Sequence, residues 1–179
     1  LSKKLGLPIN KLVVATNQND ILHRAITSGT YKAEKVIETI SPSMDIQIAS
    51  NFERLIYDLN NFDDKKTIDV MNDIKEKGKY TISKESLDKI NNDFLSTSMS
   101  EEEVLKTIKL VYDKFDIVLD PHSAIGYGAF DKINLKGKNV VLATAHPCKF
   151  PSAVKKAINF ESKLPDELLY ILDEKENYD

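Results

Sequence analysis

Three polar loops follow apolar segments of the chain, and each carries side chains that can donate, accept or transfer protons. The first covers 16–20, the second 120–123 and the third 144–149. The third is the densest, because it places a hydroxyl, an imidazole, a thiol and an ammonium group within one turn. Loops of this composition at strand ends commonly contact a ligand. We therefore expect a binding site where these loops meet.

The second loop, Asp120-Pro121-His122-Ser123, has two interpretations. Asp120 can cap a helix that starts at Pro121, because a carboxylate accepts the first free N–H groups and proline suits the first helical position. Uncapped N–H groups at this helix start could instead bind an anion. His122 here and His146 in the third loop each have a structural and a functional interpretation, and the residue types do not decide between them.

The three histidines and the single cysteine do not form a metal-binding pattern. His23, His122 and His146 are far apart in the sequence and Cys148 has no second thiol, whereas zinc sites use closely spaced ligands. We therefore expect no metal. Cys148 and His146 could form a nucleophile pair, but no third group that would orient the histidine is identifiable. A lone thiol favours a reducing compartment, so we expect a cytoplasmic protein.

Arg54 lies near the start of an expected helix, and its side chain is of the type that binds phosphate through two parallel hydrogen bonds. The alternative is a solvated helix face without a ligand. The chain has no glycine-rich loop of the Walker or dinucleotide type, which disfavours a nucleotide-binding domain. Gly126 and Gly128 are too close together for such a motif and favour close helix packing instead.

The composition is that of a folded domain. Of the 179 residues, 41% are hydrophobic and 30% charged, and the formal net charge is −3. These values exclude a disordered chain and a small disulfide scaffold. Nucleic-acid-binding proteins are more often basic, and no apolar run reaches the roughly 18 residues of a membrane span. We expect neither a nucleic acid nor a membrane as partner.

Apolar periodicity predicts strands that alternate with helices. Buried strands are expected at 11–16, 116–119 and 138–144, with a helix after each of their polar loops. Other helices are expected at 46–60, from a capping box at Ser100 and Glu103, and in the tail beyond 160. Two short surface helices are expected within 63–95, with Gly78 between them and Ser83 as the cap of the second. This order predicts an α/β fold with an open, mostly parallel sheet.

Four stretches carry distinctive motifs. They read KLVVATNQNDIL from Lys11, TISPSMDIQIASNFERL from Thr39, LDPHSAIG from Leu119 and LATAHPCKF from Leu142. In this order they resemble the C-terminal part of threonine synthases of the type found in bacteria and fungi. The pair SPSMDI and SNFER is quite specific, as is the segment TAHPCKF, and the four stretches span most of the chain.

The resemblance implies a pyridoxal-phosphate (PLP) enzyme of the tryptophan-synthase-β-like fold. Such an enzyme is a carbon–oxygen lyase that converts O-phospho-L-homoserine and water to L-threonine and phosphate. The cofactor acts as an electron sink for carbanions at the substrate's α and β carbons. Residues 1–62 and 99–179 are then segments of the large PLP domain, and 63–98 is a peripheral helical insertion.

The resemblance also implies that part of the machinery lies outside this chain. In the family, the Schiff-base lysine and the Gly/Asn-rich loop that holds the cofactor phosphate come earlier in the protein, and nothing in 1–179 matches them. The chain begins at Leu1 without a methionine. We expect a fragment that is inactive alone and whose partner is the N-terminal part of the same enzyme.

By the family pattern, the Thr144 hydroxyl is expected to contact the pyridine nitrogen of PLP. A neutral hydroxyl leaves that nitrogen largely unprotonated, whereas a carboxylate would favour its protonation. Lys149 or Arg54 is expected to supply the charge for the substrate phosphate, and Asn19 and Asp20 to order the cofactor-side loop. The full set of expected substrate-binding residues is Ser43, Asn51, Arg54, His146 and Lys149.

The alternative is a non-catalytic, truncated α/β module that binds a ligand or a partner and performs no chemistry. Such a chain would keep the wall of a site without the lysine that reacts. The two interpretations differ in what precedes Leu1 in the coding sequence: the enzyme requires a lysine loop and a phosphate-binding loop there.

Overall fold

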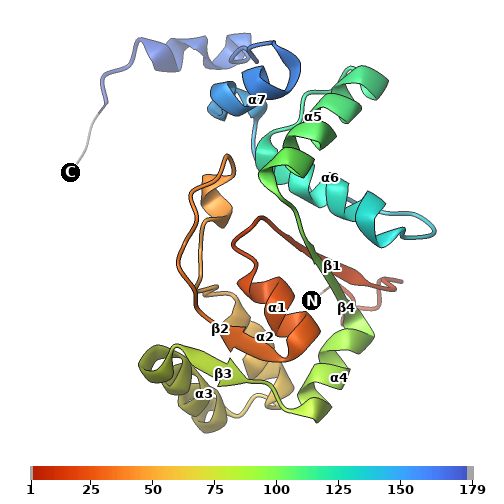
Figure 1. The fold of residues 1–179 in the computed structure, drawn as a ribbon, viewed down its shortest axis with the longest axis vertical. Helices are drawn as coiled ribbons and strands as arrows, with labels where there is room; N and C mark the ends of the chain where they lie inside the picture. Colours follow the sequence, from red (N-terminus) through yellow and green to blue (C-terminus); the bar gives the residue numbers. More distant parts are fainter. Residues whose placement is uncertain (1, 177–179) are drawn as a thin grey trace.

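The computed structural model describes residues 2–176 and confirms an α/β chain with a small parallel sheet (Figure 1). Strand β1 (Leu12–Thr16) pairs in parallel with β4 (Phe94–Ser98), with Val14 opposite Ser96. A second pair is antiparallel and joins β2 (Thr30–Lys32) to β3 (Lys79–Thr81). The strand predicted at 11–16 is thus confirmed.

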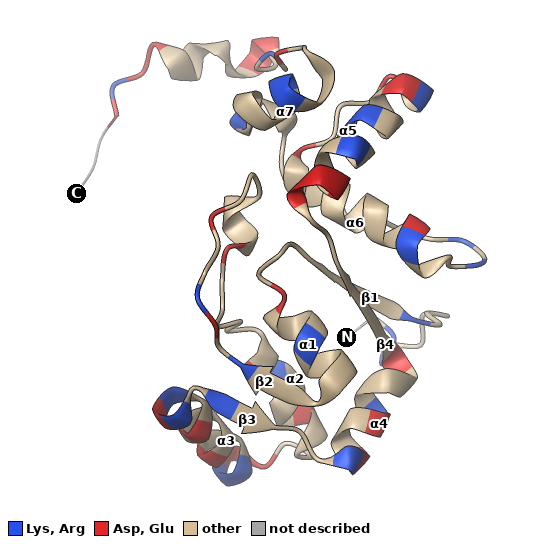
Figure 2. Cartoon of the chain, viewed as in Figure 1, with Lys and Arg blue, Asp and Glu red and all other residues tan. Residues whose placement is uncertain are grey.

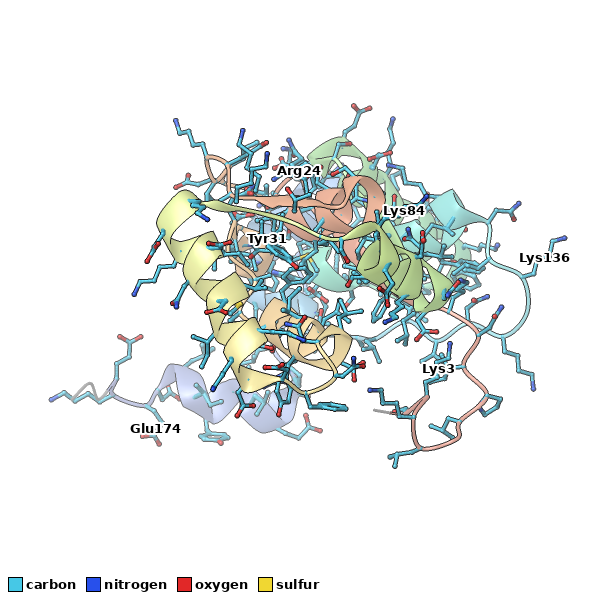
Figure 3. All side chains as sticks on the ribbon, turned by 90° about the horizontal axis from the view of Figure 1, so that it is seen from below. Lys3, Arg24, Tyr31, Lys84, Lys136 and Glu174 are labelled. Carbon is cyan, nitrogen blue, oxygen red and sulfur yellow. The ribbon has the colours of Figure 1, made fainter. Side chains whose placement is uncertain are left out.

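The part of the chain up to β4 packs around one apolar core. It contains α1 (Ile21–Ser28), α2 (Phe52–Leu59), α3 (Asp64–Lys77) and α4 (Lys84–Asp93). The core side chains come from the inner faces of these elements and include Ile21, Tyr31, Phe52, Ile56 and Ile90. Tyr31 stacks on Phe52, and burial raises the pKa of its phenol. Figure 3 shows Tyr31 among inner side chains, whereas Lys136 reaches outward at the edge of the molecule.

The part after β4 is helical. It contains α5 (Glu101–Phe115), α6 (Pro121–Ile133) and α7 (Pro151–Ile158), together with a 3-10 turn η2 (Pro147–Lys149) and a 3-10 segment η3 (Asp166–Leu172). The capping box at Ser100 and Glu103 is present. A Cβ on Gly128 would overlap Met99 and lie 2.9 Å from Thr107 Oγ1, so this glycine permits close packing of α6, as predicted.

The helix predicted at 46–60 begins only at Phe52, so the prediction is wrong for 46–51. Bonds to other elements hold this segment in a loop. The backbone N–H of Ala49 donates to the Tyr31 hydroxyl at 2.8 Å, and the Gln47 side chain accepts from Arg24 at 3.1 Å. These contacts form only in the folded chain, and local helical spacing could not reveal them.

The region 63–95 contains two helices, α3 and α4. Gly78 separates them and Ser83 caps α4, as predicted. The sequence did not reveal β2, β3 or β4, and Phe94 starts a strand instead of ending a helix. Strand β4 lies within the predicted insertion at 63–98 yet pairs with β1. The division into 1–62, 63–98 and 99–179 stays a prediction. Both signs of charge are interspersed along α3, α4 and α5 (Figure 2).

The segments 116–119 and 138–144 do not form strands, so both predictions are wrong for this chain. Val140 is 87% exposed and Leu142 74% exposed, because no described strand lies beside them. The predicted C-terminal helix takes the 3-10 form of η3. Within residues 2–176 no helix is both long and apolar enough to cross a membrane.

Candidate functional site

A buried polar cluster lies at the N-terminus of α6. Asp120 is 1% exposed, and its two carboxylate oxygens accept the backbone N–H groups of His122 at 2.9 Å and Ser123 at 3.3 Å. It also accepts the hydroxyl proton of Ser123. The cap interpretation of Asp120 is therefore confirmed. The same bonds satisfy the N–H groups that an anion would need, which removes the anion-binding alternative.

His122 connects this cluster to the loop that carries Ser43. The imidazole Nδ1 lies 2.9 Å from Asp120 Oδ1, and Nε2 accepts the backbone N–H of Ser43 at 3.2 Å. Ser43 belongs to the 3-10 turn η1 (Pro42–Met44). The ring packs against Phe150, with centroids 4.7 Å apart. With only 5% of its surface exposed, His122 is an interior residue with both ring nitrogens occupied.

Ser123 connects the same cluster to Thr144. Its oxygen accepts the backbone N–H of Thr144 at 3.0 Å and lies 3.4 Å from the Thr144 hydroxyl. Since Ser123 gives its own proton to Asp120, its oxygen can only accept from Thr144. The exposed Thr144 hydroxyl is therefore held as a donor, at a distance from Ser123 that leaves its proton available to a stronger acceptor.

The residues after Thr144 form a tight turn. His146 is exposed, and its Nδ1 accepts the backbone N–H of Cys148 at 3.2 Å. This bond uses the peptide of Cys148 and leaves the thiol out, so it gives no support to a nucleophile pair. Lys149 is exposed and borders a shallow pocket of about 250 Å³ together with Ile40 and Phe150. The structure thus brings Lys149 next to the loop of Ser43.

A second polar cluster fixes the other end of the Ser43 loop. The amide of Asn17, which is 2% exposed, donates to Asp45 at 2.7 Å and to the hydroxyls of Thr39 and Ser41 at 2.9 Å. The Asn19 side chain donates to the backbone carbonyl of Ile37 and accepts the backbone N–H of Ile37, each at 2.8 Å. Asn19 therefore orders the loop that leads to Ser43; its predicted role in the cofactor-side loop stays a prediction.

Asp20 has a different role from Asn19. Its carboxylate pairs with Arg24 at 2.8 Å on α1 and makes no side-chain cap bond. The two predicted residues Asn51 and Arg54 lie at the start of α2, in the lower part of Figure 1, away from η1 and α7. Both are exposed, and within the described part of the chain the Arg54 guanidinium makes no ion pair. The structure does not place them beside Thr144.

Sequence reasoning missed the residues that hold the site together. Asn17, Thr39 and Asp45 were not singled out, and the roles of His122 and Ser123 were left open or unassigned. The usable signal was the density of Asn, Asp, Ser and Thr in the first loop and in the SPSMD segment. Across residues 2–176 no group of three or more His, Cys, Asp or Glu side chains could hold a metal.

Comparison with known proteins shows what the chain as a whole is similar to. A family model described as "Threonine synthase, C-terminal" matches residues 123–179. The threonine synthase of Saccharomyces cerevisiae is 40% identical over 193 aligned residues, which cover 93% of this chain and 38% of that protein. The threonine synthase of Pseudomonas aeruginosa is 38% identical, and the alignment covers 98% of this chain and 38% of that protein.

The crystal structure of PLP-bound threonine synthase from Brucella melitensis superposes with a TM-score of 0.91 at 43% identity. The match covers 99% of this chain and 38% of that one. The chain thus shares the α/β fold of the matching part of that threonine synthase. The chain corresponds to the C-terminal portion of threonine synthases. It spans about 38% of the length of the relatives that it matches.

Proposed function

We propose that residues 1–179 form one wall of the active site of a PLP-dependent threonine synthase, a carbon–oxygen lyase acting on a phosphorylated substrate. The whole enzyme would convert O-phospho-L-homoserine and water to L-threonine and phosphate. The observation that carries this proposal is the match of 99% of the chain to a PLP-bound threonine synthase at 43% identity. When bound, PLP supplies an electron sink for the substrate's carbanions.

The donor set fits a PLP ring at Thr144. The Thr144 hydroxyl is neutral, exposed and available as a donor, because Ser123 beneath it can only accept. An unprotonated pyridine nitrogen needs such a donor. Asp120, the nearest carboxylate to Ser123, is buried and already accepts four hydrogen bonds. Thr144, and no carboxylate, is thus proposed to hold the ring nitrogen.

The substrate phosphate is proposed to bind between two loops. Lys149 supplies a positive charge and Ser43 a hydroxyl, and His146 lies on the same turn as Lys149. The pocket between Ile40 and Lys149 supports this pairing. Arg54 and Asn51 remain the alternative donors, from α2. Lys149→Ala is therefore expected to raise the KM for O-phospho-L-homoserine more than Arg54→Ala does.

The rest of the enzyme is proposed to supply the catalytic lysine, the cofactor-phosphate loop and strands beside 138–144. The exposed apolar side chains of Val140 and Leu142 support such docking. The division into 1–62, 63–98 and 99–179 is kept as part of this proposal, with the first and last segments in the large PLP domain. We also propose a cytoplasmic location and no activity for residues 1–179 alone.

The test is an assay of the complete enzyme with PLP and O-phospho-L-homoserine. We expect equal amounts of L-threonine and phosphate to form, and no reaction with homoserine, which lacks the leaving phosphate. The same assay on residues 1–179 alone is the matched control and should give no product. A complete, PLP-loaded protein that forms no threonine would contradict the proposal and favour a non-catalytic binding module.

A further inference from the structure

We propose that Asp120 and His122 are positioning residues that set the distance between the two ligand-binding loops of the site. The inference rests on the proposed function, because it concerns Ser43 and Thr144 as ligand contacts. One carboxylate at the N-terminus of α6 connects to both loops, through His122 to Ser43 and through Ser123 to Thr144.

In the first connection, from Asp120 through His122 to Ser43, the backbone N–H of Ser43 determines where the imidazole proton lies. The backbone N–H of Ser43 can only donate, so Nε2 of His122, 3.2 Å away, carries no proton. The proton of the neutral ring is then on Nδ1, which donates to Asp120 Oδ1 at 2.9 Å. His122 thus acts as a rigid spacer with a donor at one end and an acceptor at the other.

The second connection, from Asp120 through Ser123 to Thr144, is fixed by its donors in the same way. The Ser123 hydroxyl donates to Asp120, and its oxygen accepts the backbone N–H of Thr144 at 3.0 Å. The backbone of Thr144 is thereby fixed, and its hydroxyl has one neighbour, the Ser123 oxygen, at 3.4 Å. The cofactor-side residue and the substrate-side residue are held on the same buried carboxylate.

The cluster is rigid because it has no spare hydrogen-bonding capacity. Asp120, His122 and Ser123 are all at most 5% exposed, and the carboxylate accepts four bonds from these two neighbours. The His122 ring also packs on Phe150, which ends the turn that carries Lys149. A buried network with every member satisfied holds one arrangement. Neither Asp120 nor His122 needs to contact a ligand to act in this way.

Two substitutions in the complete PLP-loaded enzyme distinguish the contact of His122 with Asp120 from its contact with Ser43. His122→Asn keeps an amide N–H that can reach Asp120 but has no atom at the Nε2 position, so the Ser43 contact is lost. His122→Gln places its amide oxygen near the Nε2 position and restores an acceptor for Ser43. We expect the Asn variant to raise the KM for O-phospho-L-homoserine about five- to tenfold, with kcat less affected, and the Gln variant to recover most of this.

The matched control is His23→Asn. His23 lies on α1, outside the site, and its Nδ1 is 2.9 Å from the Ser96 hydroxyl. The KM of this variant should equal that of the wild type. PLP affinity, followed by cofactor absorbance, should change less than threefold in the His122 variants, whereas Ser123→Ala should weaken it about fivefold. Equal KM values for His122→Asn and wild type, or equal losses in Asn and Gln variants, would overturn the proposal.

A measurement without turnover tests the same contact in the wild-type enzyme. Nitrogen-15 NMR of the imidazole, assigned through its bonded ring carbons and the His122 backbone in the wild-type enzyme, should show a proton on Nδ1 and none on Nε2 at neutral pH. A proton on Nε2 would overturn the proposal even if the variants fail to fold. A wild-type enzyme with this tautomer but no threonine formation would instead contradict the proposed function, so the two failures are distinguishable.

Discussion

Two segments of nearly the same sequence adopt different structures in this chain. Residues 12–16 read LVVAT and form β1, whereas residues 140–144 read VVLAT and form no strand. Leu12 and Val13 are 36% and 37% exposed, against 87% for Val140 and 74% for Leu142. Both segments end in a threonine that precedes a polar loop. The difference lies in what is beside them: β1 has β4, and 140–144 has no described strand.

An apolar β-branched run therefore forms a strand only when a neighbouring strand pairs with it. Strand β1 gains backbone hydrogen bonds along its length, and the Met99 N–H adds one more to the Thr16 carbonyl at 2.9 Å. The other segment is anchored at its end, where the Thr144 N–H donates to Ser123. Pairing and side-chain contacts stabilise a strand more than intrinsic preference does.

The largest expected effect comes from placing a charge in the unpaired segment of the complete enzyme. If the rest of the protein covers this segment, Leu142→Asp buries a carboxylate and should destabilise the enzyme by about 3–5 kcal/mol. Ile68→Asp on α3, where the side chain is 57% exposed, is the control and should change stability by less than about 0.5 kcal/mol. Chemical denaturation measures both. Equal, small effects would mean that 140–144 stays exposed.

A smaller effect is expected at the loop after β1. Asn17→Ala removes the amide that bonds Asp45, Thr39 and Ser41, so each of these three side chains loses one of its hydrogen-bond partners. We expect a loss of about 2–3 kcal/mol in unfolding free energy. Gln18→Ala is the neighbouring control on an exposed side chain and should be nearly neutral. A neutral Asn17→Ala would show that the Ser43 loop does not depend on this cluster.

The smallest effects compare two glycines of α6. Gly128→Ala would overlap Met99 and approach Thr107, and should cost about 1–3 kcal/mol. Gly126→Ala would meet only the end of the Val141 side chain, at 3.1 Å, and no other atom in the described chain within 4 Å. Its cost should be offset by the gain of about 1 kcal/mol in helix propensity. Thermal denaturation of both variants tests the order, and a reversed order would contradict the packing described here.

Local signals predicted much of the fold and part of the site. Helix limits followed from residues whose chemistry acts within one turn, such as the Ser100 capping box and Gly78 in the left-handed conformation that ends α3. Strand β4, which reads FLSTS, carries too few apolar residues to stand out. Its pairing with β1 depends on a partner far away in the sequence, which no local pattern records.

The long-range contacts of the site were likewise not predictable from local sequence patterns. Thr144 and Ser43 stood out because they belong to motifs of the resemblance, and Asp120 because a helix start needs a cap. The bonds from Asp120 through His122 and Ser123 join segments separated by about 80 and 20 residues along the chain. Spacing alone does not reveal such contacts, so His122 could not be assigned as an interior spacer before the structure was known.

The proposed contact between Thr144 and PLP is tested by the turnover of Thr144→Ala in the complete enzyme, with Thr144→Ser as the matched control. The hydroxyl is proposed to hold the PLP ring nitrogen, so we expect Thr144→Ala to lower kcat about tenfold or more and to shift the cofactor absorbance. Thr144→Ser keeps the donor and should stay within about threefold of wild type. Wild-type turnover and an unchanged spectrum in Thr144→Ala would contradict the claim.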